Sequence, residues 1–277
     1  MPMLKKILNF TKIEHTAFSL PLIFTGAWMG GSNHWPQPSV LAWIVLAATG
    51  ARIFGMSFNR IFDRYIDALN PRTAGRELPS GALDLLSALT IAIAGLGTYL
   101  AACIALGSWC VFLSPLPLIP LLGYSVLKRF TMLCHFGIGI CLALAPLGAY
   151  VAAAGNPMFS ATVLLFSGFV FFWLSGADII YAVLDIESDR RTGIHSIPAR
   201  LGATGALWAA AGVHMCALAC MAALLRVVHA GALSIIAFAV TVALFAMMHL
   251  PFMPVDKRFF PVSTLAGIAG AITPLLA

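Results

Sequence analysis

The chain has 277 residues, of which 61% are hydrophobic and 9% are charged, and its formal net charge is +6. Soluble domains carry charge on about a quarter of their residues, so this composition excludes an ordinary soluble protein. The basic residues fall in the loops between long apolar segments, as in a membrane protein, and no nucleic-acid partner is expected.

Six windows contain no Asp, Glu, Lys or Arg: residues 15–51, 85–127, 130–177, 201–225, 227–255 and 259–277. A membrane-spanning helix needs about 20 apolar residues, so each of the first three windows has room for two helices. Turn-forming residues at 30–38, 107–108 and 155–157 mark the places where such pairs should reverse. The sequence therefore predicts an all-α integral membrane protein with nine transmembrane helices.

The basic residues predict the orientation. Fourteen of the sixteen Lys and Arg residues precede the first span or lie in the loops on the same side of the membrane. The two exceptions are Arg52 and Arg226. By the positive-inside rule, the N-terminus and these loops are expected to be cytoplasmic. The expected location is the plasma membrane of a bacterium.

Eight of the ten acidic residues gather in two clusters on that same predicted face. The first cluster contains Asp63, Asp67, Glu77 and Asp84, and the second contains Asp178, Asp185, Glu187 and Asp189. Asn59, Asp63 and Asp67 are spaced at i, i+4 and i+8, which places them on one helical face.

In the second cluster, Asp178, Tyr181, Asp185 and Asp189 follow at steps of 3, 4 and 4. The two clusters resemble a weak internal repeat. Carboxylates on one helical face repel each other, so such an arrangement favours a bound cation. Mg²⁺ fits best, because it takes one or two carboxylates and completes its shell with water and substrate phosphates.

Basic residues lie beside the acidic clusters: Arg72, Arg76, Lys128, Arg129, Arg190, Arg191 and Arg200. Carboxylates, Mg²⁺ and guanidinium groups together suit a diphosphate ligand. Arg52 differs from these, because it lies inside the second predicted span, where a charged residue is costly and usually functional. It is about 10 Å deeper than Asn59 by helix rise. That depth suits an anionic group of a second substrate, or the inner side of the diphosphate.

These motifs resemble those of the UbiA superfamily of intramembrane aromatic prenyltransferases, and the resemblance covers nearly the whole chain. The family signature N-D-x-x-D-x-x-x-D appears as NRIFDRYID (59–67), with Arg60 in place of the leading Asp. The second signature, Y-x-x-x-D-x-x-x-D, is intact as YAVLDIESD (181–189). The segments NPRTAGRELPSG (70–81) and YSVLKRFT (124–131) are also similar to family segments.

The resemblance implies one transmembrane prenyltransferase domain over residues 1–277, with a central cavity capped by cytoplasmic loops. It implies Mg²⁺-dependent transfer of a polyprenyl group from polyprenyl diphosphate to an aromatic acid within the bilayer. The implied Mg²⁺ ligands are Asn59, Asp63 and Asp67 for one ion, and Asp185 and Asp189 for the other. The implied diphosphate ligands are Arg72, Arg76, Lys128 and Arg191. Asp178 or Tyr181 would orient the acceptor or take its proton, and Arg52 would bind the acceptor carboxylate.

The sequence leaves alternatives open both for the acceptor and for the class of protein. The loop set and the segment 70–76 resemble enzymes of ubiquinone or menaquinone biosynthesis, so 4-hydroxybenzoate is the expected acceptor and 1,4-dihydroxy-6-naphthoate the alternative. A CDP-alcohol phosphatidyltransferase would need Gly, not Ala68, after Asp67. A cation transporter would place its acidic residues near the membrane midplane, and a non-catalytic scaffold would not need intact acidic clusters.

Overall fold

The computed structural model describes residues 3–12, 16–250 and 252–277, and within these ranges every regular element is helical. The first elements are α1 (Met3–Thr11), α2 (Thr16–Gly30), α3 (Pro38–Leu69), α4 (Leu85–Leu106), α5 (Ser108–Leu113), α6 (Pro115–Leu127) and α7 (Cys134–Ala154). They are followed by α8 (Ala161–Tyr181), α9 (Ile186–Thr192), α10 (Ile197–Val227), α11 (Ala232–Met248), α12 (Val255–Lys257) and α13 (Thr264–Ile272). Short 3₁₀ turns cover Ala182–Asp185 and Thr273–Leu276, and a π-helical segment covers Arg258–Ser263.

The helix ends confirm the three turns predicted from breaker residues. α2 ends at Gly30 and α3 begins at Pro38, α4 ends directly before Gly107, and α7 ends directly before Gly155. Gly107 and Gly155 have φ values of 114° and 68°. This is the left-handed region that glycine adopts without the steric cost borne by other residues.

Seven helical segments among the described residues are long and apolar enough to cross a membrane: Pro38–Leu69, Leu85–Leu106, Ser108–Leu127, Cys134–Ala154, Ala161–Thr192, Ile197–Val227 and Val255–Leu276. Phe18–Gly30 and Ala232–Met248 are apolar but shorter. The prediction of an all-helical integral membrane protein is therefore confirmed. The count of nine spans and the cytoplasmic N-terminus stay predictions.

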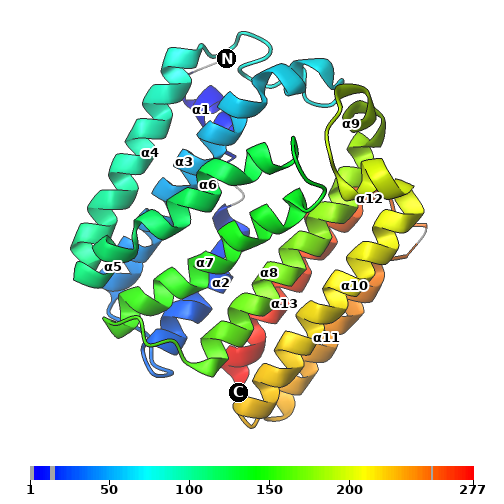
Figure 1. Cartoon of the computed structure of the whole chain (residues 1–277). Coiled ribbons are helices and arrows are strands. Elements are labelled where there is room, and N and C mark those ends of the chain that lie inside the picture. The colour runs from blue at the N-terminus through cyan, green and yellow to red at the C-terminus, as the bar shows by residue number, and fades with distance from the viewer. Residues whose placement is uncertain (1–2, 13–15, 251) are drawn as a thin grey trace.

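The long helices run side by side, and their connections alternate between the two ends of the bundle (Figure 1). α8 is the central helix, since it packs against α2, α7 and α10. Its buried Phe169 and Trp173 stack with ring centroids 6.4 Å apart, and Phe169 also stacks on Phe245 of α11. This aromatic core fixes the position of α8, whose C-terminal end carries Asp178 and Tyr181.

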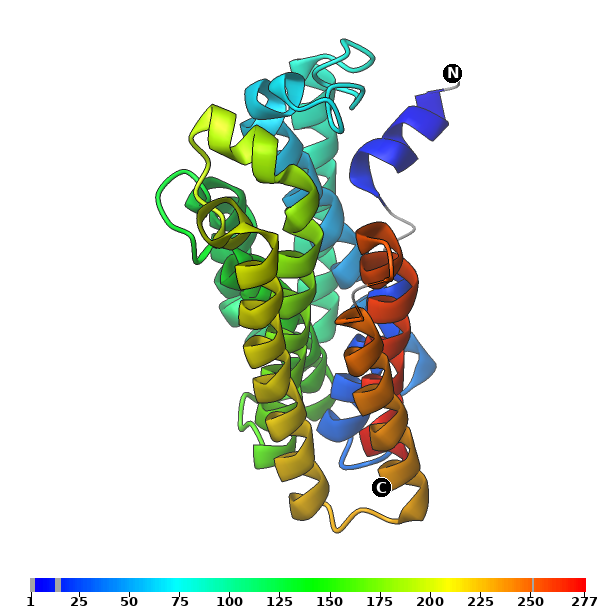
Figure 2. The ribbon, with the colours of Figure 1, turned by 90° about the vertical axis from the view of Figure 1, so that its right-hand side faces the viewer.

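Figure 2 shows α1 on the flank of the bundle, near the end that carries the loop after α3. Phe10 of α1 is fully buried in a cluster with Ile61 of α3 and Leu83 and Ala88 beyond it. Lys6 Nζ also donates to the carbonyl oxygen of Ala82 at 3.0 Å. The amphipathic first helix is thus anchored to the segment that carries the first acidic cluster.

The structure agrees with the expected helix in the first acidic cluster and corrects the second. α3 continues to Leu69, so Asp63 and Asp67 lie in its last turns. In the second cluster, α8 ends at Tyr181, and Asp185 lies in a 3₁₀ turn before α9 begins. The tighter 3₁₀ geometry breaks the regular helical face expected from the 3, 4, 4 spacing.

Candidate functional site

A cavity of about 1080 Å³ lies within the bundle, as the family resemblance implies. One end is polar and is lined by Asn59, Arg72, Arg76, Lys128, Asp178, Tyr181, Asp185 and Asp189. Another part of the wall is apolar and includes Cys103, Leu106, Leu113, Leu116 and Leu121. Such a cavity suits a ligand with an anionic head and an apolar tail.

Asp63 is the most buried acid of the first cluster, with 2% of the residue exposed. Its Oδ2 accepts hydrogen bonds from Lys128 Nζ at 2.7 Å and from Asn59 Nδ2 at 3.1 Å. Its Oδ1 is buried and has no hydrogen-bond partner among the described residues. The side chains of Asn59 and Lys128 therefore meet at the carboxylate of Asp63.

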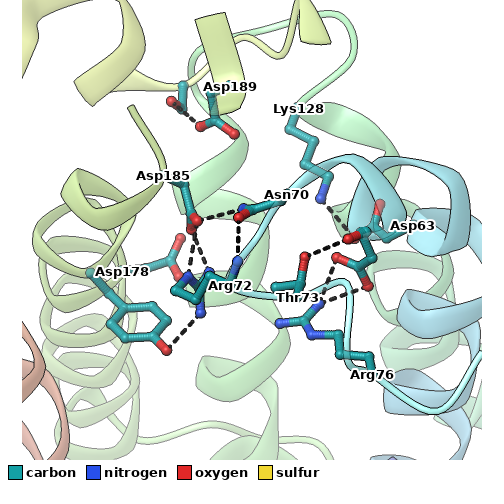
Figure 3. A network of polar contacts seen from close by, with 12 residues as sticks. Asp63, Asn70, Arg72, Thr73, Arg76, Lys128, Asp178, Asp185 and Asp189 are labelled. Atoms are coloured by element: carbon teal, nitrogen blue, oxygen red, sulfur yellow. Dashed lines mark hydrogen bonds and ion pairs between the residues drawn. The ribbon is translucent and has the colours of Figure 1, made fainter. Parts of the chain in front are cut away.

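Asp67 lies one turn further along α3, behind the basic side chain of Arg76. Arg76 Nη1 donates to both carboxylate oxygens of Asp67 at 2.8 Å (Figure 3). Thr73 Oγ1 donates to the backbone carbonyl oxygen of Asp67 at 3.0 Å. The segment after α3 thus folds back and caps the acidic end of its own helix.

The same segment reaches across to the second cluster (Figure 3). Asn70 Nδ2 donates to Asp185 Oδ1 at 2.7 Å, and Arg72 Nε donates to the same oxygen at 2.9 Å. Arg72 Nη2 pairs with Asp185 Oδ2, and its Nη1 donates to Tyr181 Oη at 3.0 Å. Residues 70–76 therefore connect two clusters that are 122 residues apart in the chain.

The electrostatics of this connection favour the charged form of Arg72. Burial of the guanidinium disfavours its charge, but the hydrogen bonds and Coulombic attraction from Asp185 outweigh this effect and raise the pKa of Arg72. Tyr181 is also held from its other side, because its ring stacks on Phe259 with centroids 4.3 Å apart. The positions of Arg72 and Tyr181 are thus fixed relative to Asp185.

Asp189 and Arg191 were both predicted to be site residues, but only Asp189 lines the cavity. Asp189 lines the cavity, and its Oδ2 accepts a hydrogen bond from Ser196 Oγ at 2.7 Å. Arg191, expected to bind diphosphate, is exposed on α9 and is not among the residues that line the cavity. Arg191 lies two positions after Asp189 in the same short helix, so its side chain is on a different face of that helix.

His135 was not identified from the sequence as a site residue. It lies on α7 with 3% of the residue exposed, and its Nδ1 is 2.7 Å from Asp178 Oδ2. The backbone N–H of Ile197 donates to His135 Nε2 at 3.3 Å. Because Nε2 accepts, the proton of a neutral ring lies on Nδ1 and is donated to Asp178. A lone histidine in an apolar window carries no spacing signal, so only the tertiary structure reveals this pair.

Arg52, which the resemblance assigns to the acceptor carboxylate, lines the cavity from α3. Its Nε donates to the carbonyl oxygen of Lys12 at 3.0 Å. This contact ties the segment after α1 to the cavity wall.

The donor set fits a hard divalent cation. Among the described residues, no three His, Cys, Asp or Glu side chains form a ready-made metal cage. The oxygens of Asn59, Asp178, Asp185 and Asp189 instead line one cavity as separate side chains, whereas Asp63 and Asp67 are not among its lining residues. The buried Oδ1 of Asp63 has no hydrogen-bond partner among the described residues, so it could accept a cation. Mg²⁺ needs only one or two carboxylates when substrate phosphates supply further oxygens.

Comparisons with known proteins identify the class of this site. Residues 19–258 match the UbiA prenyltransferase family. The chain therefore belongs to this family, and it is a transferase of the prenyltransferase class.

Two relatives illustrate the range of the family. A 4-hydroxybenzoate octaprenyltransferase of Aliivibrio fischeri (strain MJ11) is 29% identical over 191 residues, covering 68% of this chain and 66% of that protein. A digeranylgeranylglyceryl phosphate synthase of Natronomonas pharaonis is 30% identical over 196 residues, covering 69% of this chain and 67% of that protein. The matches thus span about two thirds of the length of these curated relatives.

Solved structures agree over nearly the full length. The apo structure of a UbiA homolog from Aeropyrum pernix K1 has a TM-score of 0.83 at 35% identity, covering 95% of this chain and 96% of that chain. A UbiA homolog from Archaeoglobus fulgidus bound to GPP and Mg²⁺ has a TM-score of 0.70 at 20% identity, covering 97% of this chain and 99% of that chain. At that lower identity the likeness concerns the fold.

The pairing of Arg76 with Asp67 gives a stability prediction. Arg76→Gln should lower the melting temperature, with a cost of about 1–3 kcal/mol, because it leaves a buried carboxylate without its cation. Adding Asp67→Asn removes that stranded charge and should recover part of the loss. Thermal unfolding of both variants in the same detergent measures the difference. A double variant that melts no higher than Arg76→Gln would contradict the pairing.

Proposed function

We propose that this chain, as a single transmembrane domain, transfers a polyprenyl group from its diphosphate to an aromatic carboxylic acid. The observation that carries the proposal is the polar end of the cavity, where acidic and basic side chains face each other beside an apolar wall. The name of the Aliivibrio relative supports 4-hydroxybenzoate as the acceptor. 1,4-Dihydroxy-6-naphthoate is the alternative acceptor for the same chemistry.

The proposed Mg²⁺ ligands are Asn59, Asp63 and Asp67 in one half and Asp185 and Asp189 in the other. Bound Mg²⁺ would stabilise the charge that develops on the leaving diphosphate. Arg72, Arg76 and Lys128 would bind diphosphate oxygens after exchanging their carboxylate partners for the substrate. Arg191 would need a movement of α9 to take part.

The chemical step follows from these assignments. The allylic C–O bond breaks, the electron pair leaves with the diphosphate, and the prenyl cation remains in the cavity. The aromatic ring attacks this cation ortho to its hydroxyl group and then loses a proton to Asp178, with Tyr181 orienting the acceptor. The apolar wall accommodates the prenyl chain and keeps out water, which would otherwise trap the cation.

The proposed orientation is nine spans with the N-terminus and the polar end of the cavity on the cytoplasmic side of a bacterial plasma membrane. The basic loops support it through the positive-inside rule.

A membrane assay tests the proposed function. Purified protein in lipid nanodiscs should convert polyprenyl diphosphate and 4-hydroxybenzoate to a prenylated acid and diphosphate, detected by mass spectrometry. EDTA should abolish this product and added Mg²⁺ should restore it, while Asp63→Asn should lower the rate at least about a hundredfold.

The product identifies which alternative is correct. Prenylation of 1,4-dihydroxy-6-naphthoate alone would reassign the acceptor. Release of CMP from a CDP-alcohol would indicate a phosphatidyltransferase, and cation flux without product would indicate a transporter. The absence of any prenylated acid with Mg²⁺ and both acceptors would refute the proposal.

Arg52 provides a separate prediction on acceptor binding. Arg52→Ala should raise the KM of the aromatic acid about tenfold or more, because a charge-assisted hydrogen bond to its carboxylate is lost. The KM of the prenyl diphosphate should change far less. Steady-state kinetics with each substrate varied in turn measures both values, and an unchanged acceptor KM would contradict the assignment.

His135 is predicted to position Asp178. His135→Leu removes the hydrogen bond to Asp178 and should lower kcat about tenfold or more, while the KM of the prenyl diphosphate stays nearly constant. His135→Asn keeps an N–H donor near the position of Nδ1 and should restore part of kcat. Equal kcat values for the Leu variant and the wild type would exclude this role.

A further inference from the structure

Arg60 is a buried basic residue on the cavity wall and has no ion pair among the described residues. Only 5% of the residue is exposed, and it lines the cavity from α3. Its Nε and Nη1 atoms are buried and have no hydrogen-bond partner among the described residues. A guanidinium keeps its charge under all ordinary conditions, so these donors need an acceptor.

The charged groups around Arg60 do not supply that acceptor. Asp67 and Glu77 attract Arg60 and Arg76 repels it, but neither carboxylate accepts a hydrogen bond from Arg60 Nε or Nη1. Both carboxylate oxygens of Asp67 are already bound by Arg76. Burying an unpaired charge is strongly destabilising. Such a residue persists more readily when a ligand compensates for this cost.

The position of Arg60 indicates which ligand this is. It directly follows Asn59 and precedes Asp63 by less than one turn, so it lies at the level of the first acidic cluster. Arg52, assigned to the acceptor, is eight residues away on the same helix, or about 12 Å by helix rise. An anion at the level of Arg60 is therefore closer to the diphosphate than to the acceptor.

A second donor on the same cavity wall is also unsatisfied. Ser125 of α6 is 3% exposed, lines the cavity, and its buried Oγ has no hydrogen-bond partner among the described residues. It precedes Lys128, which binds Asp63, by one helical turn. α6 packs directly against α3. Two unpartnered donors therefore flank the polar end of the cavity.

We propose that Arg60 binds phosphate oxygens of the diphosphate substrate directly, with Ser125 as an additional donor. This deepens the proposed function and rests on it for the identity of the ligand. The planar fork of Arg suits two phosphate oxygens at once. At this position the family signature has an acid, so this chain replaces a negative charge with a direct contact to the anion.

The proposal predicts opposite effects on stability and on binding. Arg60→Met removes an unpaired buried charge, so the ligand-free protein should melt at a higher temperature than the wild type. The same variant should bind inorganic diphosphate about tenfold or more weakly, because charge-assisted hydrogen bonds are lost. A residue with only a structural role would lower the melting temperature and leave the affinity unchanged.

Arg64→Met is the matched control. Arg64 lies one turn further along α3, donates to the carbonyl oxygen of Ile61 at 2.8 Å, and does not line the cavity. Its replacement should leave diphosphate affinity within about twofold of the wild type. Arg60→Lys keeps the charge without the fork, so its affinity should lie between those of the wild type and Arg60→Met.

Isothermal titration of the full-length protein in nanodiscs with inorganic diphosphate, with and without Mg²⁺, measures these affinities. A tenfold loss confined to the Arg60 variants supports the proposal, and an unchanged affinity of Arg60→Met overturns it. The measurement needs no acceptor and no turnover. A wild type that binds diphosphate through Arg60 but forms no prenylated acid would therefore refute the proposed function and leave this inference intact.

Discussion

The bridge between Arg72 and Asp185 is the interaction on which the site depends. It joins the segment after α3 to the 3₁₀ turn after α8, and Asn70 strengthens it through the same carboxylate. At the mouth of an apolar bundle, water screens charges weakly, so an unpaired carboxylate would be costly. Internal pairing stabilises the acids without ligand. Because the partners are basic side chains, the proposed Mg²⁺ ions would take over the acids and the proposed diphosphate would take over the bases, so that neither charge is left uncompensated.

The two clusters are held in different ways. Asp63 and Asp67 belong to a long continuous helix that packs against α4 and α6. Asp185 and Asp189 follow the end of α8, where hydrogen bonds from Asn70 and Arg72 hold Asp185 and one from Ser196 holds Asp189. The first half is therefore positioned by helix packing, and the second half by side-chain hydrogen bonds.

The sequence predicts much of this arrangement for identifiable physical reasons. Apolar windows and breaker residues determine where helices begin and end, because a membrane core requires internally satisfied backbone groups. The spacing of the acids indicates the two clusters. The sequence does not predict the pair of His135 with Asp178 or the exposure of Arg191, because both depend on how helices rotate against each other. The sequence also does not predict the 3₁₀ turn at Asp185, because the prediction assumes regular α-helical spacing.

The central claim is that both acidic clusters bind one diphosphate through divalent cations. Mn²⁺ binding by electron paramagnetic resonance, with inorganic diphosphate present, tests it most directly because Mn²⁺ replaces Mg²⁺ and reports phosphorus nuclei nearby. The wild type is expected to bind Mn²⁺ with resolved coupling to phosphorus. Asp63→Asn and Asp185→Asn, which lie in different clusters, are each expected to weaken that binding at least about tenfold. Equal Mn²⁺ affinity in all three proteins, or binding without phosphorus coupling, would contradict the account.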